Sequence, residues 1–369
     1  IYNRLEDKLI LFQINRIRRF AIALIGLLLI ISCERDSTPT GPGKMVLPSL
    51  SGAFVINEGN FLQGNASIDF YNADSGKIFH DLFNAANGAA PGDVAYSMVI
   101  DDTLGYIVVN NSHKIEVISI LDAERIATIR LPNGASPRNL VLDGNGNGFV
   151  SALYKNLIYQ LNMNNYTVQD SIQVGANPEE IVLQSGKLFV ANSGFGSGNT
   201  VSVIDLSTKI VSATIQVGDG PQWIRDSGGM LQVLCIGAYG DFSDPNDDTP
   251  GGIWLIDPAT NSVVDSLVLA AGIHPSDLAI SASGKGYFSN GSGIVEYNPA
   301  SLQVVNANLI SGFFYHVSVN PANGRLFVLD AKDFISPGEL IIFDEDGAEL
   351  ERHTTGVIPG DVQFIDLTN

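Results

Sequence analysis

Cysteine and recognisable catalytic motifs are scarce in this sequence of 369 residues. The two cysteines, Cys33 and Cys235, are too few for the disulfide framework of a small secreted domain, and no closely spaced pair suggests a zinc site. The sequence also lacks a G-x-S-x-G motif, an H-E-x-x-H motif and a phosphate-binding loop. We therefore predict no catalytic residues, no bound metal and no cofactor, apart from a ligand carried as cargo.

Positive charge is low as well. The chain has 20 Lys and Arg residues against 39 Asp and Glu residues, a formal net charge of −19. Five of these basic residues and two of the acidic ones lie in residues 1–32, so the remainder carries a net charge of −22. A surface this acidic repels nucleic acid and anionic lipid headgroups, which argues against a DNA or RNA partner.

The first 32 residues resemble an export signal. Arg16, Arg18 and Arg19 precede a short apolar run, which is too short to span a membrane. The sequence Ile-Ile-Ser-Cys at 30–33 is similar to a bacterial lipobox, which predicts lipidation of Cys33; an ordinary signal peptide with a chance cysteine is the alternative. Residues 33–50 are rich in Pro, Gly, Ser and Thr and predict a flexible tether, so we expect a lipid-anchored protein at the outer membrane, on the cell surface.

From residue 51 to the C-terminus the chain repeats with a period of about 43 residues, which is typical of propeller blades. Each copy has four short apolar runs separated by turn signals. Pro91, Pro137, Pro178, Pro221, Pro275 and Pro359 mark turns into the innermost strands. The predicted complete copies are 92–131, 135–175, 176–218, 219–272, 273–312 and 313–356.

The two ends of the repeat region complement each other. Residues 53–83 supply three strands and residues 357–367 supply one, so together they complete a seventh blade. We therefore predict an all-β fold over residues 51–369, a seven-bladed β-propeller whose first blade is closed by the C-terminal strand. Six or eight blades are the alternatives.

Strand order sends the longer loops to one face of such a propeller. The links between second and third strands include 58–66, 192–199 and 237–252, whereas the turns on the opposite face are short. Long loops are retained where they recognise something. These links and the blade-to-blade links contain the predicted ligand-binding residues: Asn57, Phe61, Asn110, His113, Arg138, Tyr154, Asn192, Phe195, Trp223, Tyr239, Phe242, Tyr315, His316, Asp330 and Phe334.

These side chains combine aromatic planes with amide donors and acceptors, a mixture that suits a bulky amphipathic ligand. The alternative is that the Asn residues satisfy turns and many aromatics pack between blades. The acidic loop at 241–248 could bind calcium through oxygen ligands or be a solvated loop tip. Cys235 lies in an apolar run and is predicted to be a buried hydrophobe.

Two resemblances add to this interpretation. The segments KLFVANSG and TVSVIDLSTKIVSATIQVG resemble YVTN or YncE-type propeller repeats. The segments FVINEGNFLQGNASIDFYN and SVNPANGRLFVLDAKDFISPGELIIFDEDG are similar to the seven-bladed surface lipoproteins of Bacteroidetes, grouped as surface-layer or DUF5074-type proteins. That group includes BtuG-type cobalamin-binding lipoproteins, which cap TonB-dependent corrinoid transporters. The resemblance implies a corrinoid or similar nutrient as ligand and such a transporter as partner.

Three functions follow from these observations. The leading hypothesis is a non-catalytic surface lipoprotein that captures a corrinoid for a TonB-dependent transporter. The second is a surface-layer or adhesion propeller that binds protein or glycan. The third is a propeller enzyme of the lyase or quinoprotein type, which the absence of a convergent acid–base set disfavours.

Overall fold

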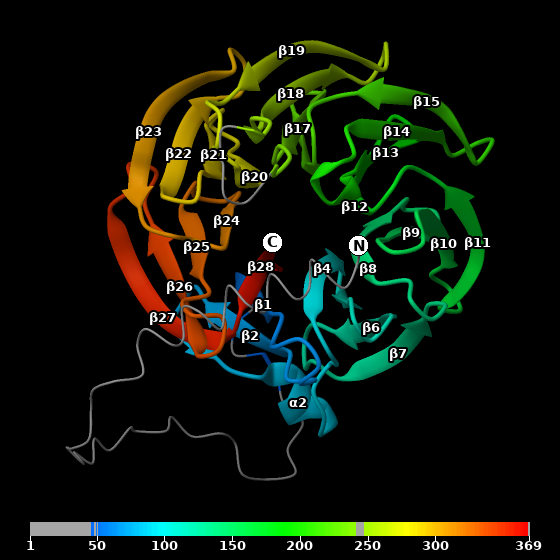
Figure 1. Cartoon of the computed structure of the whole chain (residues 1–369). Helices are drawn as coiled ribbons and strands as arrows, with labels where there is room; N and C mark the ends of the chain where they lie inside the picture. The colour runs from blue at the N-terminus through cyan, green and yellow to red at the C-terminus, as the bar shows by residue number, and fades with distance from the viewer. Residues whose placement is uncertain (1–45, 48, 50, 241–246, 368–369) are drawn as a thin grey trace. The chain divides into compact units, whose positions relative to one another are not determined.

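The structure is a computed structural model that describes residues 46–47, 49, 51–240 and 247–367. Residues 44–369 form one compact unit. Within it, seven four-stranded antiparallel sheets surround a central channel, as Figure 1 shows. The predicted all-β, seven-bladed propeller is therefore confirmed.

The chain ends share one blade, in which the strand order is β28-β1-β2-β3. Its strands are β28 (Pro359–Asp366), β1 (Ser51–Asn57), β2 (Ser67–Asn72) and β3 (Lys77–Phe79). Red β28 lies beside blue β1 in Figure 1, and the two pair in antiparallel register from Ser51↔Asp366 to Asn57↔Pro359. The predicted closing strand is thus confirmed.

The other six blades each use four consecutive strands. The first two blades comprise β4 (Ala95–Asp101), β5 (Leu104–Val109), β6 (Lys114–Ser119), β7 (Arg125–Arg130), then β8 (Pro137–Leu142), β9 (Asn147–Ala152), β10 (Leu157–Asn162) and β11 (Thr167–Gln173). The next two comprise β12 (Pro178–Gln184), β13 (Lys187–Asn192), β14 (Thr200–Asp205), β15 (Ile210–Gln216), then β16 (Pro221–Ser227), β17 (Met230–Cys235), β18 (Gly252–Asp257) and β19 (Ser262–Val268). The last two comprise β20 (Ser276–Ile280), β21 (Gly286–Ser289), β22 (Gly293–Asn298), β23 (Gln303–Ser311), then β24 (His316–Val319), β25 (Leu326–Asp330), β26 (Pro337–Phe343) and β27 (Glu349–Val357).

The described residues include two short helical elements. The sequence pattern extended the three-strand segment to residue 83, but β3 ends at Phe79 and α2 (Leu82–Asn87) follows. Leu82 and Phe83 are buried, so α2 covers apolar surface in the link to β4. A single 3-10 turn, η1 (Gly194–Gly196), lies in the link between β13 and β14.

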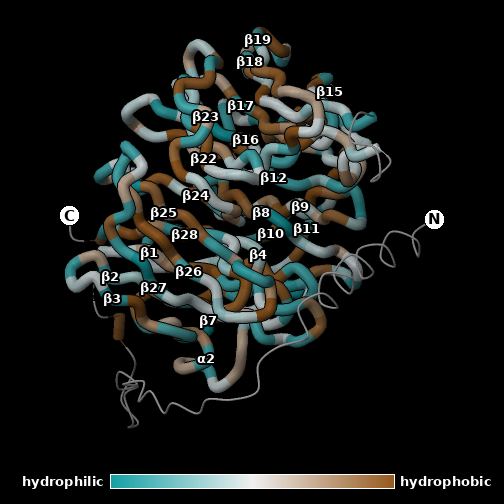
Figure 2. Tube along the Cα trace, turned by 60° about the vertical axis from the view of Figure 1, so that its left-hand side comes forward, coloured by the Kyte–Doolittle hydropathy of each residue, from teal (hydrophilic) through white to brown (hydrophobic). Residues whose placement is uncertain are grey.

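Burial follows the position of a strand within its blade. The second strand β5 is buried along almost its whole length, whereas the outermost strand β15 alternates between exposed and covered residues. Inner strands are covered by neighbouring blades on both faces, and outer strands have one side in water. Brown hydrophobic stretches in Figure 2 accordingly run through the strands, and teal stretches concentrate in the connections. The core is therefore distributed between the blades, in clusters such as Phe54, Ile107 and Ile365.

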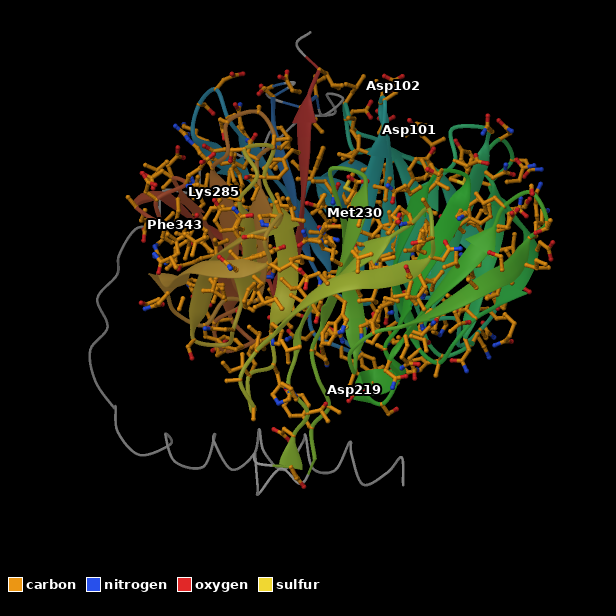
Figure 3. The ribbon with its side chains drawn as sticks, turned by 90° about the horizontal axis from the view of Figure 1, so that it is seen from above. Asp101, Asp102, Asp219, Met230, Lys285 and Phe343 are labelled. Atoms are coloured by element: carbon orange, nitrogen blue, oxygen red, sulfur yellow. The ribbon has the colours of Figure 1, made fainter. Side chains whose placement is uncertain are left out.

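The short turns on one face have a local cause in the sequence. A side-chain oxygen at the end of the third strand accepts hydrogen bonds from backbone N–H groups two or three residues later. Asp205 accepts from Ser207 and Thr208, and Asn298 accepts from Ala300 and Ser301. Figure 3 shows Asp101 and Asp102, in another of these turns, at the opposite end of the propeller from Asp219 in the link before β16. The face that contains Asp219 is called the loop-rich face below.

Candidate functional site

A cavity of about 790 Å³ occupies the central channel. Its walls come from all seven innermost strands, and Glu58 also lines it. Two consecutive residues near the start of each inner strand contribute side chains or backbone: Gly360 and Asp361, Tyr96 and Ser97, Arg138 and Asn139, Glu179 and Glu180, Gln222 and Trp223, Ser276 and Asp277, Tyr315 and His316.

The backbone before these strands directs the two residues toward the channel. A residue with positive φ precedes the anchor position in five blades: Val94, Ser136, Asn177, Gly220 and Ile358. The pairing register then shifts within the first four residues of these strands, as between Pro137 and Leu140. Such bulges bend a strand and re-aim its side chains. The predicted proline positions all lead into inner strands: Pro137, Pro178, Pro221 and Pro359 are the first residues of their strands, Pro275 directly precedes β20, and Pro91 lies in the link before β4.

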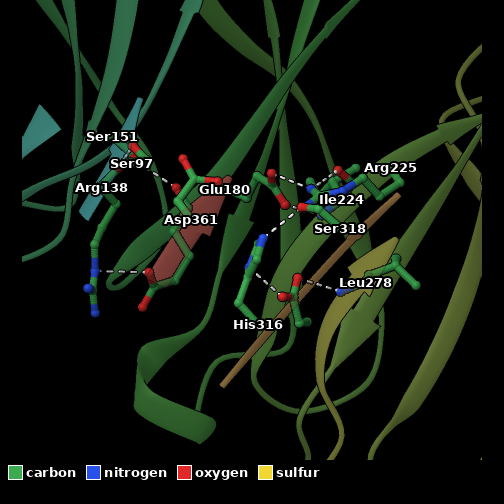
Figure 4. Close-up of polar contacts among 12 residues, drawn as sticks. Ser97, Arg138, Ser151, Glu180, Ile224, Arg225, Leu278, His316, Ser318 and Asp361 are labelled. Carbon is green, nitrogen blue, oxygen red and sulfur yellow. Dashed lines mark hydrogen bonds and ion pairs between the residues drawn. The ribbon is translucent and has the colours of Figure 1, made fainter. Parts of the chain in front are cut away.

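Three pairs of opposite charge line the cavity, several of them in view in Figure 4. The Arg138 Nε lies 3.1 Å from Glu179 Oε2. Arg225 pairs with Glu180. His316 Nδ1 lies 2.5 Å from Asp277 Oδ2, and its Nε2 lies 2.7 Å from Ser318 Oγ. Acidic and basic side chains therefore neutralise each other in part inside an otherwise acidic protein.

Carboxyl groups also join neighbouring blades. Asp361 Oδ2 accepts a hydrogen bond from the backbone N–H of Met98 at 2.9 Å. Glu180 accepts in the same way from Ile224 at 2.7 Å, and Asp277 from Val317 at 2.7 Å. These three carboxyl groups satisfy buried backbone donors across blade boundaries, so part of the acidity of the channel has a structural role.

Burial dominates the titration of the cavity carboxyl groups. It raises the pKa of Glu58 to about 7, although the Arg138 charge and a 3.0 Å hydrogen bond from the Tyr315 hydroxyl act to lower it. Burial likewise raises the pKa of Asp361. Asp277 differs because the charge and hydrogen bond of His316 outweigh its burial and lower its pKa. The pKa of His316 is raised in turn by Asp277, against the effect of burial.

Exposed aromatic side chains gather in the links of the loop-rich face, and one of them, Phe313, also lines the cavity. Among the described residues, the five aromatic ones with strongly exposed side chains all lie in links of the loop-rich face: Phe61, Tyr154, Phe195, Tyr239 and Phe313. The exposed large hydrophobic residues of the outermost strands, such as Ile210 and Val305, are aliphatic. The two faces of the propeller therefore differ in chemistry as well as in loop length.

Some of these rings contact each other. The Tyr154 and Phe195 ring centroids, from neighbouring blades, lie 5.9 Å apart. A second series of rings leads into the cavity. The Phe334 ring centroid lies 6.3 Å from that of Phe313 and 5.4 Å from that of Tyr315. Tyr239 stacks on the His274 imidazole with centroids 3.8 Å apart.

The predicted ligand-binding residues fall into four groups in the structure. Arg138, Trp223, Tyr315, His316 and Phe334 line the central cavity. A second group is exposed in links of the loop-rich face: Phe61, Tyr154, Phe195 and Tyr239. Phe242 lies outside the described residues.

The fourth group makes hydrogen bonds within the propeller. Asn57 donates to Ser67, Asn110 to the Pro137 carbonyl, and Asn192 to Thr200 and Ser202. His113 accepts from the Ser136 N–H, and Asp330 accepts from the Lys332 N–H. Asn57 and Asn192 are fully buried. Their side chains therefore make hydrogen bonds inside the propeller, which agrees with the alternative interpretation of the Asn residues. These hydrogen bonds do not test ligand contact, which stays a prediction for these five residues.

Sequence reasoning missed most of the charged residues of the cavity. Glu58, Glu179, Glu180, Arg225, Asp277 and Asp361 were absent from the prediction, and all line the channel. The signal that could have found most of them is their distance from the anchors. Glu179, Glu180 and Asp361 follow Pro178 or Pro359 by one or two residues, just as the predicted Arg138 follows Pro137.

The described residues offer neither a cluster for a metal ion nor a membrane-spanning helix. The described residues contain no group of three or more His, Cys, Asp or Glu side chains arranged to hold a metal ion. In the acidic loop, Asp248 contacts His274 Nε2 at 3.0 Å, and residues 241–246 lie outside the described part of the chain. Cys235 is buried, and burial raises the pKa of its thiol, so its thiolate is disfavoured. Among the described helices, none has the length and apolar character needed to cross a bilayer.

Comparison with known proteins gives a family-model match over part of the chain. Residues 51–233 match the model of a domain of unknown function, DUF5074. The DUF5074 match runs from β1 into β17 and therefore includes the inner strands that carry Tyr96, Arg138 and Glu179. A search of curated proteins found no match.

Two solved structures are similar in fold. Hydrazine synthase of Kuenenia stuttgartiensis has a TM-score of 0.59 and 15% identity, covering 73% of this chain and 93% of its own. A quinonprotein alcohol dehydrogenase-like protein from Bacteroides thetaiotaomicron has a TM-score of 0.62 and 13% identity, covering 86% of this chain and 78% of its own. At such low identity, the similarity concerns the propeller architecture alone.

Proposed function

We propose that this protein is a non-catalytic binding protein that captures a bulky, partly planar nutrient on its loop-rich face. The chemical class that we favour is a corrinoid, and the recipient is a TonB-dependent outer-membrane transporter. The observation that carries the proposal is the set of five exposed aromatic side chains in links of the loop-rich face, with no counterpart on the opposite face within the described residues.

Exposed aromatic rings are costly unless a partner covers them. Burying apolar surface is worth about 25 cal/mol per Å², and binding energy concentrates in a few aromatic and Arg anchors. Phe61, Tyr154 and Phe195 come from links of three different blades, so a ligand that covers them all must be large. A rigid macrocycle fits this requirement, because it spans several loops without losing much conformational entropy.

The polar central cavity suits the edges of such a ligand. Carboxyl groups such as Glu58 accept hydrogen bonds, and Arg138 donates them. A corrin ring carries amide side chains around an apolar plane, so its edge offers donors and acceptors to both kinds of group. This complementarity supports the corrinoid class over a purely apolar lipid.

Delivery to a transporter rests on the sequence of the N-terminal segment. Lipidation of Cys33 and a tether over residues 33–50 would hold the propeller near the membrane surface while leaving it free to reorient. The resemblance to surface lipoproteins that cap transporters supports the same arrangement.

An enzyme of the quinoprotein type is less well supported. One similar structure bears a quinoprotein-like name, but at 13% identity this does not transfer a function. The cavity is lined by Glu58, Glu179, Glu180, Asp277 and Asp361 against only two guanidinium groups, those of Arg138 and Arg225. This excess of carboxyl groups suits a multiply anionic quinone cofactor poorly.

Calorimetric titration of the purified protein with cobalamin and with cobinamide tests the proposal. We expect saturable binding of at least one corrinoid at micromolar concentration or below. Phe195→Ala should weaken it by on the order of 2 kcal/mol, as truncated aromatic anchors do. Asn145→Ala, in a turn of the opposite face, is the matched control and should leave binding unchanged. If no corrinoid binds, or if both variants have equal effects, the surface-layer or adhesion function becomes the better explanation.

A further inference from the structure

Arg138 differs from the other charged residues of the cavity in how its donors are used. Its Nε edge faces Glu179 Oε2 at 3.1 Å, and one face of its guanidinium lies over the Tyr96 ring, 4.1 Å from the centroid. Its two terminal nitrogens make no hydrogen bond with any described residue.

The position of this side chain is fixed from three directions. The backbone before it is held by Ser136, which has a φ of 46°, and by the Pro137 ring. The Arg138 carbonyl accepts a 2.7 Å hydrogen bond from the Ser97 hydroxyl of the adjacent blade. Its Tyr96 contact comes from that same adjacent blade. A guanidinium constrained in this way loses little entropy when its remaining donors bind a ligand.

The carboxyl groups nearby already have donors of their own. Glu58 accepts from Tyr315, Asp277 from Val317 and His316, and Asp361 from Met98. Arg225, the other guanidinium of the cavity, donates from Nη1 both to Glu180 and to the Ile224 carbonyl. One terminal nitrogen of Arg225 is therefore engaged, whereas Arg138 keeps both terminal nitrogens for the pair of parallel N–H donors that planar oxyanions require.

We propose that Arg138 anchors a singly charged oxyanion of the ligand, a phosphate diester or a carboxylate, through its two terminal nitrogens. The Tyr96 ring and Glu179 hold the guanidinium in place without consuming those donors. This assigns an anion subsite in the wall of the central channel. Its link to corrinoids rests on the proposed function, because cobalamin carries a phosphate diester that cobinamide lacks.

Two small anions test the subsite without assuming any corrinoid. Dimethyl phosphate and acetate each have methyl protons that report binding through saturation-transfer NMR on the purified protein. We expect saturable binding of at least one of them, weakened by about tenfold or more in Arg138→Gln. Arg225→Gln is the matched control, since it removes one positive charge from the same cavity; it should change the affinity by less than about twofold.

Two further variants separate a lost donor pair from a damaged fold. Arg138→Lys keeps a positive charge beside Glu179 but offers no parallel donors, so it should also weaken binding, by about fivefold or more. The double variant Arg138→Gln/Glu179→Gln keeps the net charge of the cavity and should lose binding as fully as Arg138→Gln. The proposal is overturned if neither anion binds the wild-type protein, or if binding weakens equally in the Arg138 and Arg225 variants.

Corrinoid titrations connect the subsite to the proposed function. Arg138→Gln should lower the affinity for cobalamin by about tenfold and that for cobinamide by less than about twofold. Equal effects on both ligands would remove Arg138 as the phosphate anchor while leaving corrinoid capture intact. If neither corrinoid binds the wild-type protein, the proposed function fails, and the small-anion titrations alone decide whether the subsite exists.

Discussion

Closure of the propeller by β28 can be tested with a single side chain. Ile365 is 7% exposed and packs into the apolar cluster that contains Phe54 and Ile107. Val362, three residues earlier on the same strand, is 3% exposed and belongs to a different cluster with Val55 and Leu329. The closing strand therefore supplies a side chain to each of the two interfaces that its blade makes, and Ile365→Ala should weaken one of them selectively.

The expected cost follows from the atoms removed. Ile365→Ala deletes three buried carbon groups, which at about 0.8 kcal/mol each amounts to roughly 2.4 kcal/mol. The cavity left behind raises this to about 3–4 kcal/mol, since the rigid strand cannot collapse into the space. Val362→Ala removes two groups and should cost about 1.5–2.5 kcal/mol. Whole domains are stable by only about 5–15 kcal/mol, so the double variant should be severely destabilised.

Urea unfolding followed by circular dichroism measures these free energies. The two substitutions lie in different clusters, so their effects should add within about 0.5 kcal/mol. Leu350→Ala, on the exposed side of β27, is the control and should change the free energy of unfolding by less than about 0.5 kcal/mol. If Ile365→Ala costs no more than Leu350→Ala, then β28 does not close the propeller as described.

Three further predictions concern the cavity, the chain end and the anchor. Burial raises the pKa of Glu58 to about 7, above its value in the unfolded chain, so the stability that this group contributes is present in acid and is lost as the pH rises through about 7. The free energy of unfolding of the wild-type protein should fall by on the order of 1–3 kcal/mol between about pH 5 and pH 8 because of this group. Glu58→Gln should flatten that part of the profile of unfolding free energy against pH, measured with urea. An unchanged profile would argue against ionisation of Glu58. Deletion of residues 357–369 removes all of β28 and should give insoluble protein or a large drop in Tm, whereas a truncated protein that melts like its parent would contradict the closing strand. Cys33→Ala should release the protein from membranes in a fractionation experiment, and unchanged membrane association would rule out lipidation at Cys33.

Sequence patterns predicted the architecture well because it depends on local, repeated signals. Short apolar runs define strands, Asp205 and Asn298 shape their turns through hydrogen bonds to residues two or three positions later, and the 43-residue period repeats both. The missing fourth strand of the first blade could likewise be predicted by counting. The short helix α2 was not predicted, because six residues with two buried side chains leave little periodic signal.

The candidate site was predicted only in part. Phe61, Tyr154 and Phe195 could be assigned to one face from strand order, since order alone decides which links share a face. Glu58, in the link 58–66, and Asp277, two residues after Pro275, carried positional signals of this kind, but nothing in the sequence marked their side chains as partners in the channel. Their significance depends on meeting Tyr315 and His316, which come from other blades.

The sequence by itself thus determined the blades, their number, the closing strand and the face that bears the long loops. Each of these follows from the spacing of residues along one chain. Only the tertiary structure decided which charges meet in the channel and which donors of Arg138 are left unused. The physical reason is that the channel wall takes two residues from each of seven strands far apart in the sequence, so burial, pairing and pKa are properties of the closed ring.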